Sequence, residues 1–453
     1  MDTKKLRQKI LDLAIRGKLV PQDPNDEPAS VLLERIKAEK ERLIKEGKIK
    51  RSKKSASDTS HYENVPFEIP ESWEWTTFED IADSLLGKML DKKKVEGIPL
   101  KYLRNINVRW GYFELSDLLE MPFKAEEKDR YSIRKGDLVI CEGGEPGRCA
   151  IWDNDTDIMY QKALHRMRPF YGISNQYLSF VLMQYSNSGY LEKYYTGSTI
   201  KHLTGESLSS IPVPIPSYHE QQQIVCEIDK WFTFIDSIDE NKLSLLSAIE
   251  QAKSKVLLLA VSGKLVPQEL NDEPATELLK RINPNIEIPC DNPHYQKLPN
   301  GWAMTSMQNI CQLRDGEKQS DIPRINLDVK YLRGKSEGEI VSSGKYVPSG
   351  STMILVDGEN SGEIFTSVID GYQGSTFKLL DVSSEMNMGF VLLVIKNHQQ
   401  EFRENKVGSA IPHLNKKLFK EIAVMIPPIE EQQRIVESTQ QYLNLLELIS
   451  DKL

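Results

Sequence analysis

The sequence predicts an α+β protein in which two mixed α/β domains are separated by long antiparallel coiled-coil helices, in a pseudo-twofold repeat. Two repeated stretches carry this prediction. IPVPIPSYHEQQQIV from Ile211 returns as IAVMIPPIEEQQRIV from Ile422, and GKLVPQDPNDEPASVLLERI from Gly17 returns as GKLVPQELNDEPATELLKRI from Gly263. The middle of the chain therefore holds both halves of a unit whose halves stand separately at its two ends, and such a repeat takes precedence over local assignments.

The central repeated stretch predicts one long helix. Apolar residues from Ile224 to Leu259 recur at three- and four-residue steps with charged residues between them, the pattern of a narrow packing seam. Pro216 precedes the helix, Gly263 suits a C-terminal cap and Pro267 prevents continuation. Roughly 45 residues would form a rod on the order of 65 Å, which cannot bury its seam alone. Its expected partner is the C-terminal helix followed by the N-terminal helix, so the repeat is circularly cut.

Changes in composition divide the chain into five segments. Both mixed domains begin alike, with IPESW and LPNGW, and continue with KYLR at Lys101 and at Lys330. Each also contains a hairpin signature, GDLVICEGGEPGRCAIW from Gly136 and STMILVDGENSGEIFTS from Ser351. The expected segments are an N-terminal helical region (1–62), a first mixed domain (63–216), a central helical spacer (217–294), a second mixed domain (295–428) and a C-terminal helix (429–453).

The composition is typical of a globular chain without a targeting segment. Of 453 residues, 39% are hydrophobic and 27% are charged, which provides enough apolar side chains for sizeable cores. The five cysteines form no CxxC pair, which favours reduced thiols over metal ligands. The N-terminal segment is too charged for a signal peptide and no apolar run is long enough for a bilayer, so we expect a cytoplasmic protein without membrane contact.

The charge pattern leaves nucleic acid open as a partner. A net charge of −8 argues against phosphate contacts, but basic residues cluster at 48–54 and at 92–94. Each cluster also fits a solvated linker or loop. The motifs of phosphate loops, dinucleotide sites, zinc proteases and serine hydrolases are all missing from the sequence. We therefore predict no catalytic residue, no metal site and no cofactor bound by this chain.

The repeated motif IPxPxPxxxEQxxI, followed by a long helix and GKLVPQ, resembles the specificity subunit of type I restriction-modification systems over essentially the whole chain. The resemblance implies two target recognition domains that read a bipartite site in double-stranded DNA. It also implies helices that dock two methyltransferase subunits, and with them endonuclease subunits. S-adenosylmethionine, ATP and Mg²⁺ would belong to those partners. The motif residues, with an implied role in the start of the long helix and in docking, are Pro216, Glu220, Gln221, Ile224, Pro427, Glu431, Gln432 and Ile435.

Polar residues in the two mixed domains are the candidates for DNA contact, because arginine, lysine and amide side chains read base edges in the major groove. Each of them also fits an ordinary surface residue without a contact. The candidates are Arg104, Asn105, Asn107, Arg109, Lys201 and His202 in the first domain, and Arg324, Asn326, Arg333, Lys335 and His413 in the second.

Two other functions remain open on the sequence alone. One is a protein-binding coiled-coil scaffold, and the other is the recognition subunit of a fused nuclease-methyltransferase of another restriction class. If the chain recognises a bipartite DNA site, the long helix would set the number of unspecified base pairs between the two half-sites. Four residues inserted near Ser247 should then lengthen this gap by about two base pairs. The chain ends map close together on the central copy, so joining them and reopening the chain elsewhere should be tolerated.

Overall fold

The computed structural model describes residues 2–49, 65–89, 96–286, 298–408 and 412–453. The chain divides into two compact units, Met1–Glu240 and Asn241–Leu453. The boundary falls within the long helix α6 (Tyr218–Val261), so each unit contains one part of it. Most of the basic cluster at 48–54, the cluster at 92–94, Cys290 and the expected domain bounds near 62 and 294 lie outside the described residues.

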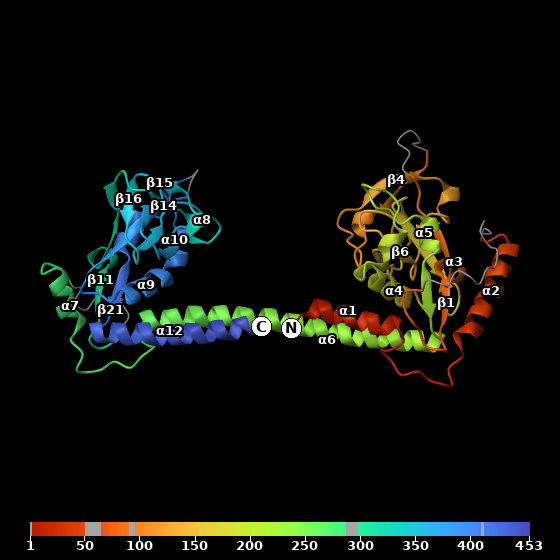
Figure 1. Cartoon of the computed structure of the whole chain (residues 1–453), viewed down its shortest axis with the longest axis horizontal. Helices are drawn as coiled ribbons and strands as arrows, with labels where there is room; N and C mark the ends of the chain where they lie inside the picture. Colours follow the sequence, from red (N-terminus) through yellow and green to blue (C-terminus); the bar gives the residue numbers. More distant parts are fainter. Residues whose placement is uncertain (1, 50–64, 90–95, 287–297, 409–411) are drawn as a thin grey trace. The chain divides into compact units, whose positions relative to one another are not determined.

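In the first unit, α1 (Thr3–Ile15) runs antiparallel to the first part of α6 (Figure 1). Arg7 Nη2 donates to Asp236 Oδ1 at 2.7 Å near the start of α1. Toward the other end of α1, buried apolar side chains join one core with residues from the beginning of α6: Ile10, Leu11, Ala14, Ile224, Ile228 and Ile235. The apolar seam predicted for the long helix is therefore buried against α1 in this unit.

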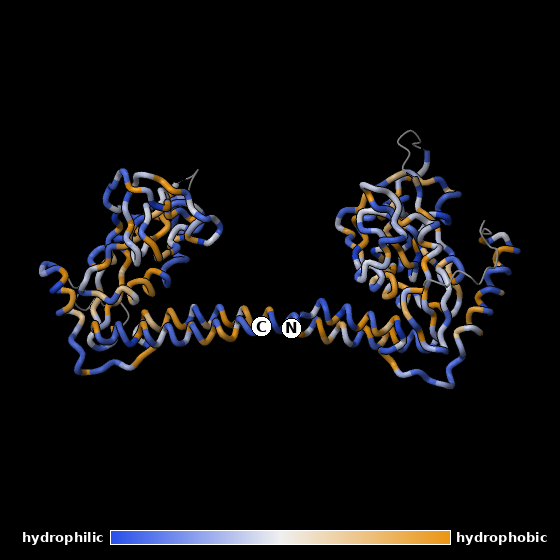
Figure 2. Tube along the Cα trace, viewed as in Figure 1, coloured by the Kyte–Doolittle hydropathy of each residue, from blue (hydrophilic) through white to orange (hydrophobic). Residues whose placement is uncertain are grey.

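The second unit repeats this arrangement with α12 (Ile429–Asp451) beside the last part of α6. Near the end of α12, Lys242 Nζ of α6 donates to the carbonyl of Leu453. Near the start of α12, Arg434 pairs with Asp272, which follows the C-terminal end of α6. Hydrophobic and hydrophilic residues alternate along these helices (Figure 2), as a two-helix seam requires. The predicted antiparallel helix pairing is thus confirmed within each unit.

The mixed domain of the first unit contains two four-stranded sheets and a two-stranded ribbon. The first sheet has the order β2-β9-β6-β7, the second β4-β3-β8-β5, and β1 pairs with β10. The strands are β1 (Glu74–Thr77), β2 (Ala82–Leu86), β3 (Ile98–Leu103), β4 (Leu119–Phe123), β5 (Ser132–Ile133), β6 (Leu138–Cys141), β7 (Cys149–Ile151), β8 (Ile158–Tyr160), β9 (Leu164–Pro169) and β10 (Pro212–Ile215). The further helices are α2 (Ala29–Lys45), α3 (Phe78–Ile81), α4 (Asn175–Asn187) and α5 (Gly205–Ser209), with short 3₁₀ turns that include η2 (Asn105–Asn107).

The second unit has the same strand topology with one added edge strand. Its sheets run β12-β20-β17-β18 and β13-β16-β19-β14-β15, and β11 pairs with β21. The strands are β11 (Ala303–Ser306), β12 (Cys311–Arg314), β13 (Glu317–Gln319), β14 (Arg324–Leu327), β15 (Ile340–Val341), β16 (Gly344–Val347), β17 (Thr352–Leu355), β18 (Ile364–Thr366), β19 (Gly371–Gln373), β20 (Phe377–Val382) and β21 (Ala423–Ile426). The helices are α7 (Ala275–Ile282), α8 (Val329–Leu332), α9 (Met388–Asn397), α10 (Gln399–Glu404) and α11 (Lys416–Glu421). The predicted α+β class with two mixed domains is confirmed.

The strand pairings confirm one repeat and correct another. Both predicted hairpins form, as β6–β7 in the first unit and β17–β18 in the second. The KYLR match is wrong, because residues 101–103 lie in β3 whereas residues 330–332 lie in helix α8. The strand equivalent to β3 is β14. β3 pairs in parallel with β8, which ends at Tyr160 just before Gln161, and β14 pairs in parallel with β19, which ends in Tyr372 and Gln373.

The start of each long helix is held by a group that we call the polar lock: one buried glutamate, one buried tryptophan and one glutamine at the surface. The Glu220 carboxylate accepts hydrogen bonds from Trp73 Nε1 at 2.9 Å and from Gln22 Nε2 at 2.5 Å. The second unit repeats the lock with Glu431, Trp302 and Gln268. Each lock joins the helix start to the first strand region of the mixed domain and to the GKLVPQ segment.

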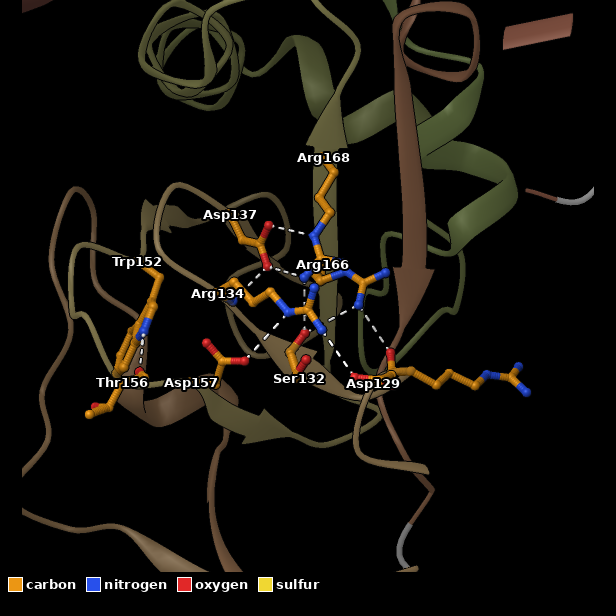
Figure 3. Close-up of polar contacts among 10 residues, drawn as sticks. Asp129, Ser132, Arg134, Asp137, Trp152, Thr156, Asp157, Arg166 and Arg168 are labelled. Atoms are coloured by element: carbon orange, nitrogen blue, oxygen red, sulfur yellow. Dashed lines mark hydrogen bonds and ion pairs between the residues drawn. The ribbon is translucent and has the colours of Figure 1, made fainter. Parts of the chain in front are cut away.

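A charged cluster joins the two sheets of the first mixed domain (Figure 3). Arg168 of β9 binds Asp137 through two hydrogen bonds, Nε to Oδ1 at 2.7 Å and Nη2 to Oδ2 at 2.8 Å. Arg166 is buried on the same strand and donates to the carbonyls of Arg130 and Ser132, beside β5 of the other sheet. Burial lowers the pKa of Arg166, so its hydrogen bonds to those carbonyls are needed to offset desolvation.

Candidate nucleic-acid interface

The η2 turn after β3 carries two of the predicted DNA-contact residues, Asn105 and Asn107, and a third, Arg104, is its N-cap residue, but only some of them face outward. Asn107 is 1% exposed, and its side-chain amide donates to the carbonyls of Glu114 and Asp117. Its Oδ1 accepts from the backbone N–H of Arg104. All of these bonds stabilise the turn itself, which leaves no free group for a base. The structure therefore corrects the expectation for Asn107, which supports the turn rather than contacting DNA.

The remaining candidates near this turn lie closer to the surface. Arg104 Nη2 donates to the Asp117 carboxylate at 2.7 Å and to the Asp117 carbonyl at 2.8 Å. Arg109 is half-buried. Asn105 Nδ2 donates to the Gly143 carbonyl at 3.3 Å, which places the turn against the β6–β7 hairpin. A Cβ on Gly144 would lie 2.8 Å from Asn105 Nδ2, so this close approach requires glycine.

An open hollow of about 680 Å³ lies where the η2 turn, the β6–β7 hairpin and the segment around His202 meet. It brings together two predicted residues, Asn105 and His202. The segment is fixed by backbone bonds, with Leu203 N–H donating to the Glu142 carbonyl at 2.7 Å. The lining also includes Met89, Glu142, Gly143, Gly144, Gln161, Lys162, Ala163, Thr196, Ile200 and Thr204. Lys201 lies outside this lining, with Nζ 5.7 Å from the centre of the Tyr195 ring.

Glu142 is the acidic residue of the hollow, and sequence analysis did not identify it. Burial raises the pKa of its carboxyl group, while the charges of His202 and Lys162 act in the opposite direction. The sequence does hold a usable signal: the equivalent position in the β17–β18 hairpin is also acidic, Asp357. An acidic residue on the hairpin and a histidine from a later loop thus recur in both mixed domains, and in the second domain the two are in contact.

In the second mixed domain the predicted residues are scattered and paired internally. His413 Nδ1 lies 2.6 Å from Asp357 Oδ1. Arg324 Nη1 lies 3.5 Å from Asp370 Oδ2, and its guanidinium stacks over Tyr346 at 4.5 Å from the ring centre. Three more candidates complete the set: Arg333 pairs with Glu363, Asn326 lies half-buried in β14, and Lys335 is exposed after α8. DNA contact by each of these residues stays a prediction.

The repeated motif residues lie inside their units. Gln221 Nε2 donates to the carbonyls of Gly172 and Pro216, and its Oε1 accepts from Ser174 N–H at the start of α4. Gln432 repeats these contacts with Pro427 and Asn387 at the start of α9. Burial raises the pKa of both lock glutamates. The eight motif residues are all buried, namely Pro216, Glu220, Gln221, Ile224, Pro427, Glu431, Gln432 and Ile435. Docking at these positions stays a prediction and would have to use neighbouring exposed side chains.

Exposed apolar side chains recur at matching positions of the two helix-start repeats. On α6, Trp231 is 40% and Phe234 is 56% exposed. The equivalent residues of α12, Tyr442 and Leu445, are 49% and 55% exposed. Leu448 continues this face on α12. We call these two surfaces the outer helix faces. The apolar seam predicted for the long helix included Trp231 as a packed residue. Its exposure shows that this prediction is wrong for Trp231.

Two features of the described ranges concern metal binding and membrane contact. Among residues 2–49, 65–89, 96–286, 298–408 and 412–453, no group of three or more histidine, cysteine or acidic side chains is placed to hold a metal ion. No helix in these ranges is both long and apolar enough to cross a membrane. Cys141, Cys149 and Cys311 are buried, and burial raises the pKa of each thiol, so they act as small apolar residues.

Comparison with known proteins gives one consistent result. Residues 70–248 and 299–453 match the family described as type I restriction modification DNA specificity domain. The chain is 33% identical over 427 residues to the specificity subunit of the type I restriction enzyme EcoAI from Escherichia coli, covering 79% of this chain and 70% of that subunit. It is 32% identical over 337 residues to the EcoEI specificity subunit from the same species, covering 62% of this chain and 54% of that subunit.

Two solved structures share the fold. The HsdS subunit from Thermoanaerobacter tengcongensis matches with a TM-score of 0.53 and 16% identity, covering 85% of this chain and 93% of that one. A chain from a structure on complex assembly and conformational transition of the type I R-M system matches with a TM-score of 0.56 and 15% identity, covering 85% and 94%. At these identities the likeness concerns the fold alone.

Proposed function

Because this chain belongs to the type I restriction-modification DNA specificity family, we propose that it reads a bipartite DNA site with its two mixed domains. We call them recognition domain 1 and recognition domain 2. The observation that supports this proposal most directly is one strand topology carrying two different polar surfaces. A repeated frame with different side chains is what two different half-sites require, since base edges are distinguished by side-chain chemistry.

The contrast between the polar networks of the two domains illustrates this point. In recognition domain 1, Arg168 pairs with Asp137 and also donates to the Ser132 carbonyl of the other sheet. In recognition domain 2, Asp315 pairs instead with Lys378 and Lys345, and those lysines hold the pKa of the Asp315 carboxyl well below its usual range. The frames agree while the charged residues on them differ, so each domain presents its own set of donors and acceptors.

The outer helix faces support docking of two copies of one partner. Trp231 and Phe234 on α6 correspond to Tyr442 and Leu445 on α12, and all four are at least 40% exposed. Exposed aromatic and aliphatic groups along a helix are typical of helix-mediated association. Because the same kind of surface occurs twice, we propose that it binds two methyltransferase subunits, with endonuclease subunits joining through them.

Catalysis in this scheme belongs to the partners. The described part of the chain offers no cluster of metal ligands. Of its buried acids, Glu220 and Glu431 belong to the polar locks and Asp137 is paired with Arg168. We propose that adenine methyl transfer, with S-adenosylmethionine, and DNA cleavage, with ATP and Mg²⁺, take place on the docked subunits. The role of this chain is to select the DNA site.

The test is to express the chain with its methyltransferase partner in a host without other modification systems and to sequence the host methylome. We expect one methylated motif made of two defined half-sites separated by unspecified bases. A matched strain that expresses the methyltransferase alone should lack that motif. A methylome without any bipartite motif, combined with stable assembly of the chain with another protein, would favour the scaffold function.

The choice between a separate and a fused enzyme has its own measurement. Purified complex should contain this chain and the methyltransferase as distinct polypeptides, with nuclease activity dependent on a third polypeptide. Nuclease activity in a complex of two polypeptides would instead favour a fused nuclease-methyltransferase of another restriction class.

A further inference from the structure

The hollow in recognition domain 1 contains two hydrogen-bond acceptors that lack a donor. Gln161 Oε1 is buried and has no hydrogen-bond partner. The Glu142 carboxylate lines the same hollow, and within the described ranges no side chain or backbone N–H donates to it. Buried acceptors in proteins are nearly always paired, so the unpaired Gln161 Oε1 requires an explanation, and the half-buried Glu142 carboxylate supplies a second accepting group in the same hollow.

Recognition domain 2 shows that the fold itself does not require these unpaired groups. At the position equivalent to Glu142, Asp357 lies 2.6 Å from His413 Nδ1. At the position equivalent to Gln161, Gln373 Oε1 accepts from Gly316 N–H at 2.9 Å. Both acceptors are thus satisfied inside recognition domain 2, whereas both are open in recognition domain 1.

The loop geometry explains why His202 does not satisfy Glu142. His202 is held by two backbone hydrogen bonds with Thr196, and its ring packs beside Gly143, where a Cβ would lie 3.1 Å from His202 Nδ1. The ring is therefore directed at the hairpin backbone. Glu142 consequently keeps its accepting oxygens for a group that enters the hollow.

The chemistry of DNA limits what that group can be. Along the major-groove edge, the exocyclic amino groups at adenine N6 and cytosine N4 are donors, whereas guanine O6 and thymine O4 are acceptors. Two acceptors without donors match an amino group and disfavour a carbonyl oxygen. Lys162 and Asn105 at the rim can meet the neighbouring phosphate or base acceptors.

We propose that this hollow is a base-reading pocket in which Glu142 and Gln161 accept hydrogen bonds from one exocyclic amino group in the half-site bound by recognition domain 1. The inference rests on the proposed function, and it adds two specificity-determining residues and the chemical class of the base group. Recognition domain 2 reads its half-site without an equivalent pair.

The test removes single amino groups from the DNA. Once the motif is known, the complete methyltransferase complex is titrated with duplexes in which one adenine is replaced by purine or one cytosine by 2-pyrimidinone, position by position. We expect one replacement in the first half-site to weaken wild-type binding about tenfold. Whether the sensitive position is an adenine or a cytosine identifies the base.

The variant Glu142→Met, which removes both accepting oxygens and keeps the length of the side chain, should then lose this dependence and bind the unmodified and amino-deleted duplexes to within about twofold of each other. Gln161→Met, which keeps the length of the side chain, should reduce the dependence as well. Glu145→Met is the matched control, because it removes a carboxylate from the same hairpin, but one that is already paired with Arg148 and Trp110. It should keep the wild-type dependence.

Binding to the second half-site shows that each variant is folded, since no change there is expected. The inference is overturned if no amino deletion in the first half-site affects wild-type binding, or if Glu142→Met retains the full dependence. Failure of the proposed function looks different, because the wild-type complex would then show no site preference at all.

Discussion

Among single residues, the lock glutamates have the largest structural role. Glu220 is 4% exposed and Glu431 is fully buried, yet each carboxylate is satisfied by an indole N–H and an amide. The EQ motif in the sequence predicted the start of the long helix. It did not predict the lock, because the donors to Glu220 come from Gln22 and Trp73, which are 198 and 147 residues away along the chain.

Removing the tryptophan donor should destabilise the first unit. Trp73→Phe leaves the buried Glu220 carboxylate with one donor fewer, so we expect a loss of about 1–3 kcal/mol. The control is Trp110→Phe, whose indole donates to the exposed Glu145, with an expected loss below about 1 kcal/mol. Urea unfolding combined with hydrogen exchange at the start of α6 measures both. Equal losses in the two variants would contradict the role of the lock.

The lock also predicts a pH dependence of stability. Burial raises the pKa of Glu220 above 4.5 in the folded chain. The folded state therefore binds this proton more tightly than the unfolded chain, and stability falls as pH rises from 4.5 through the folded pKa.

Glu220→Gln should remove this contribution to the slope. The free energy of unfolding of the first unit, measured by urea at a series of pH values, should depend less on pH in the variant than in the wild type. Glu227→Gln, on the exposed side of α6 beside Lys230, should keep the wild-type slope. A slope unchanged by Glu220→Gln would show that the lock is not the source.

At the scale of elements, local patterns predicted the hairpins but failed on KYLR. The hairpin signature combines alternation with a Gly-rich turn, and both features act locally. Residues 330–333 carry the same letters as 101–104, but Asp328 caps them as a helix by accepting from Tyr331 N–H. Which state a four-residue stretch adopts is decided by its neighbours, and here the cap determined it.

The ion pair that joins β9 to β6 should stabilise recognition domain 1. Asp137→Asn leaves Arg168 and the neighbouring Arg166 without their nearest buried carboxylate, so we expect a loss of about 2–3 kcal/mol. Asp153→Asn is the control, because that residue is exposed beside Lys135 and its pair contributes at most about 1 kcal/mol. Hydrogen exchange of β5, β6 and β9 should increase only in the first variant. Exchange that stays at wild-type levels in Asp137→Asn would mean that this ion pair does not stabilise recognition domain 1.

The outer helix faces should matter for assembly and not for folding. Phe234→Glu places a charge on the exposed face of α6 and should weaken association with the methyltransferase subunit at least about tenfold. Because Phe234 is 56% exposed, the thermal stability of the free chain should stay within about 1 °C of the wild type. Full affinity after Phe234→Glu would exclude this face from docking.

At the scale of the whole molecule, the repeat was the most reliable sequence signal. It predicted two mixed domains and antiparallel helix pairs because duplicated segments fold alike whatever their surfaces carry. The reading residues could not be predicted in this way. Asn107 and Arg104 have the polarity of base readers, but the structure uses Asn107 to build a turn, while Glu142 and Gln161 became visible only as unpaired acceptors in a shared hollow.

Exchange of a complete domain tests the division of labour. Replacing residues 63–216 with the corresponding domain of a relative should change one half-site in the methylome and leave the other unchanged, because recognition domain 2 keeps its own sheets and core. The reciprocal exchange of residues 295–428 should change only the other half-site. A change in both half-sites after either exchange would contradict separate reading.

The polar lock also has a consequence for the order of events during protein synthesis. Gln22 leaves the ribosome 198 residues before Glu220, so at roughly 5–20 residues per second it waits about 10–40 s for its partner. During that interval the apolar face of α1 has no α6 to cover it. The nascent chain thus carries an uncovered amphipathic helix throughout translation of recognition domain 1, and chaperones have this period in which to shield it.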